Sequence, residues 1–286
     1  MTVFERRGQS RAHDWDWSQS QARGRGSREA PDSCRLHHIP DSSSSQHAPE
    51  LSWKDAALEL LWPHRCVGCE APQELLCETC REKLPWIVQA TACPVCGAPH
   101  GWMNCTECAR DWPLRTTICA WSHVDAAASA IRVYKDGGER ALAPILACAL
   151  EVALTEAASW PALDGRPRFD VDAVDAVCFV PATPEAYARR GADHMEIPAR
   201  LLAGYLGLPL VDALARLSPQ DQRSLGRELR QQNLQGSCHV VGEVSGMSFL
   251  LVDDVCTTGA TLKTCAQALL DRGAREVSAA CVTRVW

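Results

Sequence analysis

From about residue 117 to the C-terminus, short apolar runs alternate with longer segments in which apolar residues recur at helical spacing. The apolar runs predict strands over residues 176–180, 237–241, 248–252 and 277–282. The longer segments predict helices over residues 126–134, 140–155, 185–206, 221–232 and 260–272. Strands that alternate with helices are typical of an α/β domain, so we expect one with a mainly parallel sheet.

The chain before residue 117 lacks this alternation. Residues 1–50 are rich in Ser, Arg, His and Gln and have no apolar period, which predicts a disordered N-terminal tail. Apolar residues at helical spacing predict a short helix over 53–62. Residues 64–115 carry cysteine pairs with Pro and Gly between them, so something other than an apolar core must hold them together. We therefore expect a tail over 1–50, a cysteine module over 51–115 and an α/β domain over 116–286.

Composition excludes several classes of protein. Apolar residues make up 46% and charged residues 22% of the 286, which is enough for a core. The longest uncharged apolar run, residues 141–150, is too short to cross a bilayer, so we expect neither a membrane protein nor a membrane partner. Residues 1–50 hold no apolar signal-peptide core, which favours a cytoplasmic location. The formal net charge of -6 gives no overall attraction to nucleic acid.

Eight of the 16 cysteines form four regularly placed Cys-x-x-Cys pairs: Cys66/Cys69, Cys77/Cys80, Cys93/Cys96 and Cys105/Cys108. A two-residue gap lets both thiolates of a pair bind one ion, and two pairs complete a tetrahedral site, so we expect two structural Zn2+ sites. Gaps of 7 and 8 residues within each half, against 12 between the halves, favour pairing in chain order. Crossed pairing, iron in place of zinc, and redox-active pairs remain alternatives.

The sharpest pattern lies at residues 249–261, where a buried apolar strand leads through two acids and a short turn into a helix. Backbone amides at the helix start, the positive end of the helix dipole and threonine hydroxyls converge there on a volume the size of a phosphate. We call residues 257–261 of this segment the threonine turn; they are Thr257, Thr258, Gly259, Ala260 and Thr261. The alternative is that Thr258 and Thr261 only cap the helix.

Asp253 and Asp254 come directly before this turn, at the carboxyl end of the strand, where open α/β sheets bind ligands. A pair of carboxylates suits the vicinal hydroxyls of a sugar, either directly or through a metal ion. The alternative is that both acids are solvated. The chain lacks the G-x-x-x-x-G-K-[ST] loop, which argues against nucleotide hydrolysis by a P-loop.

Residues 249–261 resemble the 5-phosphoribosyl-1-pyrophosphate (PRPP) signature of type I phosphoribosyltransferases. From about Leu51 to the C-terminus, the chain resembles the ComF/GntX family, whose members carry a zinc module before a phosphoribosyltransferase domain. The likeness is carried by the cysteine pairs and by residues 134–137, 180–181, 189–191, 216–222, 230–233 and 249–261. It implies a double zinc ribbon before an α/β domain of the type I phosphoribosyltransferase fold, in a cytoplasmic protein linked to natural competence and DNA uptake.

The resemblance also implies roles for individual residues. It puts the ribose hydroxyls on Asp253 and Asp254, and the 5-phosphate in the threonine turn. The loop after Val180 and Pro181 would face pyrophosphate and Mg2+. Three cations would lie near the leaving group: Lys135, Arg189 and Arg190. Without the resemblance, each of them would be interpreted as a solvated surface charge. Loss of pyrophosphate creates a cationic ribose centre and a highly charged leaving group, so Mg2+ and fixed cations would lower the barrier.

These expectations lead to functions from different classes. The first is a phosphoribosyltransferase-like protein that binds PRPP with Mg2+ and transfers the phosphoribosyl group to an acceptor that the sequence does not name. The second is a non-catalytic adaptor or sensor that keeps the PRPP pocket and works with a DNA-uptake helicase or a recombination mediator. Direct binding of single-stranded DNA is a third hypothesis, which Trp86, Trp102 and Trp112 permit.

One departure from the family bears on this choice. The family reads Arg-Gly-Phe-Asn-Gln where this chain reads Arg-Gly-Ala-Asp-His, over residues 190–194. The loss of an aromatic ring and an amide affects base stacking or loop closure at this point, and it keeps the adaptor hypothesis open. His194 could act as an acid or base near neutral pH, but we expect a surface or capping role for it.

Overall fold

The computed structural model describes residues 64–103, 105–108, 112–216 and 238–286. The tail predicted over 1–50 and the helices predicted over 53–62 and 221–232 lie outside these ranges. No helix within the ranges is both long enough and apolar enough to cross a bilayer.

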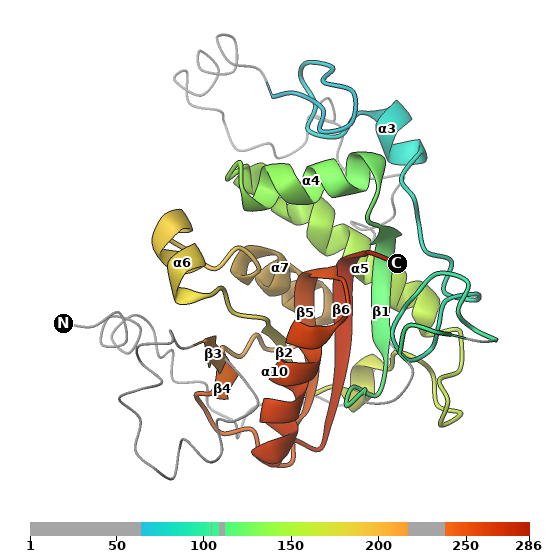
Figure 1. Cartoon of the computed structure of the whole chain (residues 1–286), viewed down its shortest axis with the longest axis vertical. Coiled ribbons are helices and arrows are strands. Elements are labelled where there is room, and N and C mark those ends of the chain that lie inside the picture. The colour runs from blue at the N-terminus through green and yellow to red at the C-terminus, as the bar shows by residue number, and fades with distance from the viewer. Residues whose placement is uncertain (1–63, 104, 109–111, 217–237) are drawn as a thin grey trace. The chain divides into compact units, whose positions relative to one another are not determined.

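A four-stranded parallel sheet forms the centre of the α/β domain (Figure 1). From one edge to the other, its strands are β1 (Thr117–Ser122), β6 (Glu276–Arg284), β5 (Ser248–Cys256) and β2 (Ala176–Phe179). Nearly every residue of these strands is buried, because helices cover both faces of the sheet. That burial explains why the strands predicted over 176–180, 248–252 and 277–282, which are confirmed, read as continuous apolar runs.

Helices pack on both faces of this sheet. In chain order they are α4 (Asp125–Lys135), α5 (Ala143–Ala157), α7 (Glu196–Leu206) and α10 (Ala260–Asp271). α10 lies on one face, and α5 and α7 lie on the other (Figure 1). The side chains of β5 alternate accordingly: Leu250 and Val252 pack in the core with α5 and α7, whereas Phe249 and Leu251 pack in the core with α10.

The helix predicted over 185–206 is wrong, because two helices occupy this range. α6 (Pro184–Arg190) ends at Gly191, whose φ of 75° lies in the left-handed region that glycine adopts without strain. In the break before α7, the buried side chain of Asp193 accepts a hydrogen bond from the backbone amide of Ala182. The break thus ties the loop after β2 to the start of α7.

Two strands also differ from the prediction. β1 was not predicted, because its apolar run is only four residues long and its strand geometry comes from parallel pairing with β6. β5 continues past residue 252 to Cys256, because Asp253 pairs with Cys281 of β6 although a carboxylate disfavours a strand. The strand predicted over 237–241 exists as β4 (Cys238–Val240), but it pairs antiparallel with β3 (Leu214–Arg216), outside the main sheet.

The described part of the cysteine module contains one short helix, α3 (Glu78–Glu82). The backbone of the cysteine module is hydrogen-bonded to the edge of β1 that does not pair with β6. The amide of Ile87 donates to the carbonyl of Ala120 at 2.8 Å, and the amide of Ser122 donates to the carbonyl of Pro85 at 2.8 Å. The module is therefore attached to the sheet by backbone hydrogen bonds as well as by side-chain packing.

Candidate functional site

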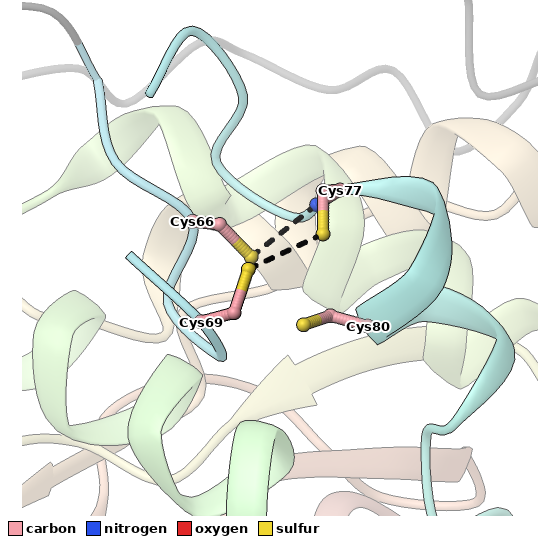
Figure 2. A group of neighbouring side chains, drawn as sticks. All are labelled: Cys66, Cys69, Cys77 and Cys80. Atoms are coloured by element: carbon pink, nitrogen blue, oxygen red, sulfur yellow. Dashed lines mark hydrogen bonds between the residues drawn. The ribbon is translucent and has the colours of Figure 1, made fainter. Parts of the chain in front are cut away.

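The first cysteine cluster consists of Cys66, Cys69, Cys77 and Cys80. A turn at Cys66 and Cys69 and the start of α3 at Cys77 and Cys80 bring the four sulfur atoms together, and one potential ligand atom from each residue lies within 4.8 Å of all the others (Figure 2). The Sγ atoms of Cys69 and Cys77 are 3.6 Å apart, and the backbone amide of Cys77 donates to Sγ of Cys66 at 3.4 Å. Amide donors of this kind stabilise thiolates, which are the form of cysteine that binds a metal.

The second cysteine cluster consists of Cys93, Cys96, Cys105 and Cys108. Its cross-pair Sγ distances are 3.7 Å between Cys93 and Cys108 and 3.5 Å between Cys96 and Cys105. A tetrahedral site with Zn–S bonds of about 2.3 Å requires sulfur atoms about 3.8 Å apart, so the spacing fits zinc. The pairs associate in chain order, so crossed pairing is wrong. Four protein ligands would complete each shell and leave no position for a reacting water, an arrangement typical of structural zinc sites.

The threonine turn joins the end of β5 at Cys256 to the start of α10 at Ala260. Gly259 is the N-cap of α10 and has a φ of 70°, a conformation that glycine adopts without strain, and it is buried where the ring of Trp112 lies against it. Thr257 and Thr258 are exposed. The amide of Ala260 donates to Oγ1 of Thr258 at 3.4 Å, a long hydrogen bond that a ligand can replace at little cost. The start of α10 is thus accessible to an anion.

The two acids before the turn are buried, so the alternative that they are solvated is wrong: Asp253 is 7% exposed and Asp254 is 3% exposed. Oδ2 of Asp254 accepts a hydrogen bond from Nζ of Lys135 at 2.6 Å and a second one from Nε2 of His194 at 3.1 Å. Oδ1 of Asp253 accepts a hydrogen bond from the backbone amide of Asp254 at 2.9 Å.

These environments shift the two pKa values in opposite directions. Burial raises the pKa of Asp253, and the neighbouring charge of Asp254 raises it further. Burial also acts to raise the pKa of Asp254, but the hydrogen bond from His194 and the charge of Lys135 together hold that pKa well below its usual range. The two neighbouring carboxyl groups therefore differ in their affinity for a proton, and Asp253 is the easier of the two to protonate.

His194 is a central part of this site, and the surface or capping role expected for it is wrong. Its side chain is 10% exposed and contacts Asp254. Its backbone carbonyl accepts a hydrogen bond from the hydroxyl of Tyr134 at 2.6 Å, and its Nδ1 lies 3.2 Å from Nη1 of Arg190. Tyr134 and Asp254 each lie 60 positions from His194, so no local spacing in the sequence could have revealed these contacts.

The three cations expected near the leaving group differ in position. Lys135 contacts the acid pair directly, and Arg190 reaches it through His194. Arg189 lies at the rim: its side chain is 68% exposed, and its Nη2 is 3.8 Å from Oδ1 of Asp136. The structure thus brings two of the three cations to the acids and leaves the third in solvent.

Val180 and Pro181 are buried just beyond the end of β2. The amide of Val180 donates to the carbonyl of Val252 at 2.9 Å, which holds the loop after β2 directly beside the strand that carries the acids. Two neighbouring strands of the sheet therefore deliver their following loops to one region.

A pocket opens beside the start of α10, and its lining is Arg216, Cys238, Ala260, Thr261, Thr264 and Cys265. Two of these residues belong to the threonine turn, and Arg216 comes from β3. A guanidinium beside a helix N-terminus favours a negatively charged group. The arginines of the helix predicted over 221–232 lie outside the described residues.

The three tryptophans considered for binding single-stranded DNA are not arranged as an open platform. Trp86 packs edge-to-face on Trp121 with ring centroids 5.6 Å apart. Trp112 packs against the second cysteine cluster, and Trp102 is 57% exposed. Because stacking platforms use several accessible rings, this arrangement weakens the hypothesis of direct DNA binding.

Comparisons with known proteins match two separate parts of this chain. Residues 57–109 match the family model of the double zinc ribbon domain, and residues 194–285 match that of the phosphoribosyl transferase domain. The DNA utilization protein YhgH of Salmonella typhimurium is 27% identical over 231 residues, which cover 78% of this chain and 97% of that protein. The competence protein ComFC of Bacillus subtilis is 27% identical over 214 residues, which cover 71% of this chain and 80% of that protein.

The chain is homologous to YhgH and ComFC over most of its length. These matches confirm the resemblance found in the sequence. They also confirm a phosphoribosyltransferase-like α/β fold that follows two four-cysteine clusters along the chain. In this ComFC homologue, the transferase match begins at His194 and includes the acid pair and the threonine turn. A purine phosphoribosyltransferase structure from Pyrococcus horikoshii is 20% identical and covers 50% of this chain and 73% of that chain, with a TM-score of 0.29.

Proposed function

We propose that this protein binds PRPP together with Mg2+ and transfers the phosphoribosyl group to an acceptor. The observation that carries the proposal is the buried acid pair at the carboxyl end of β5, followed at once by a turn that opens onto the start of α10. A sugar phosphate needs both features, an anion site and hydroxyl partners, within a few ångströms of each other.

The threonine turn would hold the 5-phosphate. The first amides of α10 point toward the turn, and the helix dipole adds partial positive charge there. The hydroxyls of Thr257, Thr258 and Thr261 would supply further donors. Since Thr257 and Thr258 are exposed, a phosphate can reach them without a rearrangement of the core.

The acid pair would hold the vicinal hydroxyls of the ribose. The carboxylate of Asp254 would accept a hydrogen bond from one hydroxyl, and the carboxyl group of Asp253 would form a hydrogen bond with the other. The negative charge of Asp254 would also stabilise the positive charge that develops on the ribose as the leaving group departs.

The loop after β2 would face the pyrophosphate. Lys135 and Arg190 are the fixed cations of this chain on that side of the site, and each stabilises negative charge as it accumulates on the departing group. Bound Mg2+ supplies further neutralisation of the phosphate oxygens. Carboxylate and phosphate oxygens are the ligands that this ion prefers, which fits the donor set of the acid pair.

A second candidate is a non-catalytic adaptor or sensor that binds PRPP and acts with a DNA-uptake helicase or a recombination mediator. Two observations favour it. His194 occupies the site where the family has an amide, and the relatives are named for DNA utilization and competence. Both candidates are expected to work in the cytoplasm, where PRPP and reduced thiols occur.

Calorimetry with PRPP and Mg2+ tests the binding step. We expect saturable binding to the wild type and a loss of about 30-fold or more in Asp254→Asn, the equivalent of one charge-assisted hydrogen bond. Asp271→Asn is the matched control, because Asp271 lies at the far end of α10 and bonds Gln267 at 2.7 Å. No binding to the wild type would overturn both candidates.

Release of pyrophosphate separates the two candidates. The bound protein is mixed with single nucleobases and other nitrogen acceptors, and free pyrophosphate is measured over time. Release that depends on one acceptor, and that Asp254→Asn abolishes, supports the transferase. Binding without release for any acceptor supports the adaptor.

A further inference from the structure

Arg284, the last residue of β6, connects the second cysteine cluster to the threonine turn. Its side chain is 1% exposed. Nη1 donates to the carbonyl of Cys256 at 3.2 Å and also to the carbonyl of Thr257. Nε donates to the carbonyl of Cys96 at 3.3 Å. One guanidinium therefore holds the backbone of the turn and the backbone of a predicted zinc ligand at the same time.

The loop that carries the second cysteine cluster also supplies a negative charge beside Arg284. Oε2 of Glu107, between Cys105 and Cys108, lies 3.7 Å from Nη2 of Arg284. Only arginine offers five N–H donors in a rigid fork, so one side chain can serve carbonyl groups from two separate segments. A buried guanidinium is costly unless such partners are present, which makes the arrangement sensitive to the loss of any one of them.

Trp112 makes a second and independent connection. Its ring packs against the buried group that contains Cys93 and Cys96, and its Nε1 donates to Oγ1 of Thr117 in β1 at 3.0 Å. The same ring touches the turn: a Cβ added to Gly259 would lie 2.2 Å from its Cη2 atom. The second cysteine cluster thus contacts the turn through both an arginine and an aromatic ring.

The first cysteine cluster packs elsewhere. A Cβ added to Gly68, inside its first turn, would lie 3.1 Å from Cβ of Ala126 in α4. Val67, Leu75 and Cys80 pack against the core that contains α4 and α5. This difference provides an internal comparison, because the two clusters share their chemistry but not their neighbours.

We propose that Arg284 is a positioning residue that makes the shape of the threonine turn depend on metal in the second cysteine cluster. Without the ion, the four thiols have no common centre and the loop that carries the Cys96 carbonyl is released. Arg284 then loses that partner, and Trp112 loses the packing that holds it against Gly259. The assignment of the turn as a phosphate site rests on the proposed function, whereas the mechanical link does not.

Hydrogen exchange over residues 256–266, followed by mass spectrometry, tests the link without any ligand. Arg284→Lys keeps the positive charge but removes the forked guanidinium donors. We expect hydrogen exchange over residues 256–266 to become about tenfold faster or more. Arg168→Lys is the matched control, because Arg168 is 6% exposed and its Nε likewise donates to a carbonyl, that of Pro161, at 3.1 Å. Unchanged exchange in Arg284→Lys, or an equal change in Arg168→Lys, would overturn the link.

The metal dependence is tested with one variant in each cluster. Cys105→Ser and Cys69→Ser are each expected to lower the zinc content by about one equivalent. Cys105→Ser should speed exchange over residues 256–266 at least about fivefold more than Cys69→Ser does. Equal effects on that segment would overturn the proposal, because they would point to a general loss of stability.

PRPP affinity then connects the link to the site. If the wild type binds PRPP, Arg284→Lys should weaken binding about tenfold or more, and Arg168→Lys should stay within about twofold. If the wild type does not bind PRPP, the proposed function fails and exchange alone decides the link. If Arg284→Lys does not fold, Trp112→Phe tests the same link, with Trp86→Phe as its control. Equal exchange rates over residues 256–266 in these two variants would overturn the proposal.

Discussion

Nζ of Lys135, at the end of α4, lies 2.6 Å from Oδ2 of Asp254, near the end of β5, although 119 positions separate the two residues. The same oxygen accepts a hydrogen bond from His194. Asp253, the neighbour of Asp254, contacts a backbone amide instead. The pKa values of two adjacent carboxyl groups therefore shift in opposite directions, because different elements surround them.

Substitution by the isosteric amide should separate the two acids. Asp254→Asn leaves Lys135 without its carboxylate, and we expect it to lower the free energy of unfolding by about 2–4 kcal/mol. Asp253→Asn removes a buried carboxyl group whose raised pKa makes its ionised form unfavourable in the folded state, so we expect no loss of stability at pH 7. Urea denaturation in the presence of zinc, followed by circular dichroism, measures both values. Equal losses in the two variants would contradict the opposite pKa shifts.

The raised pKa of Asp253 predicts a pH dependence of definite sign. Between its unfolded pKa of about 4 and its higher folded pKa, the folded protein binds one more proton than the unfolded chain, so this group favours folding less as the pH rises. Asp253→Asn removes the effect. The stability of this variant relative to wild type should therefore increase with pH, by up to about 1.4 kcal/mol per unit. A difference that is constant between pH 5 and 8 would show that Asp253 is ionised in the folded state.

Metal content tests the two cysteine clusters. We expect two zinc ions per chain by elemental analysis, each with four sulfur neighbours at about 2.3 Å by X-ray absorption. Chelation should destabilise the cysteine module first, because a structural zinc site supplies part of the folding free energy. One zinc ion or none in freshly purified protein would contradict the double-ribbon assignment.

Much of the fold was predictable because its signals are local. The buried strands appear as apolar runs, and the gaps between the cysteine pairs favour the association in chain order that the structure has. The acid pair and the threonine turn lie in one continuous segment, so a single reading found both. The end of α6 was also available from sequence, since Gly191 is the type of residue that ends a helix, and missing it joined two helices into one.

The contacts between distant segments were not predictable. His194 meets Tyr134 and Asp254, each 60 positions away, and Arg284 meets Cys96, 188 positions away. A lone histidine and a lone arginine carry no periodic signal, because their partners are chosen by the packing of complete elements. Sequence reasoning therefore identified the segment of the candidate site and, through the family resemblance, Lys135 and Arg190, but it missed the contacts of His194 and Arg284.

The chain's departure from its family at His194 leads to a further prediction. Glutamine at this position can still donate a hydrogen bond to Asp254, so His194→Gln should keep the stability within about 1 kcal/mol of wild type. His194→Leu leaves the buried carboxylate with one partner fewer, and we expect a loss of about 1–3 kcal/mol. Urea denaturation at pH 7 compares the two variants. A similar loss in both would mean that the ring itself, through Arg190, supports the site.

Gly259 offers the most direct test of how tightly the turn is packed. Alanine there would have to adopt a φ near 70°, and its Cβ would lie 2.2 Å from the ring of Trp112. Gly246 is the matched control, because it has a φ of 71° and a Cβ there would meet nothing within 4 Å. We expect Gly246→Ala to cost about 1 kcal/mol through backbone strain alone, and Gly259→Ala to cost about 2–4 kcal/mol because the ring must also move. Equal costs in urea denaturation would mean that Trp112 yields freely and does not hold the turn.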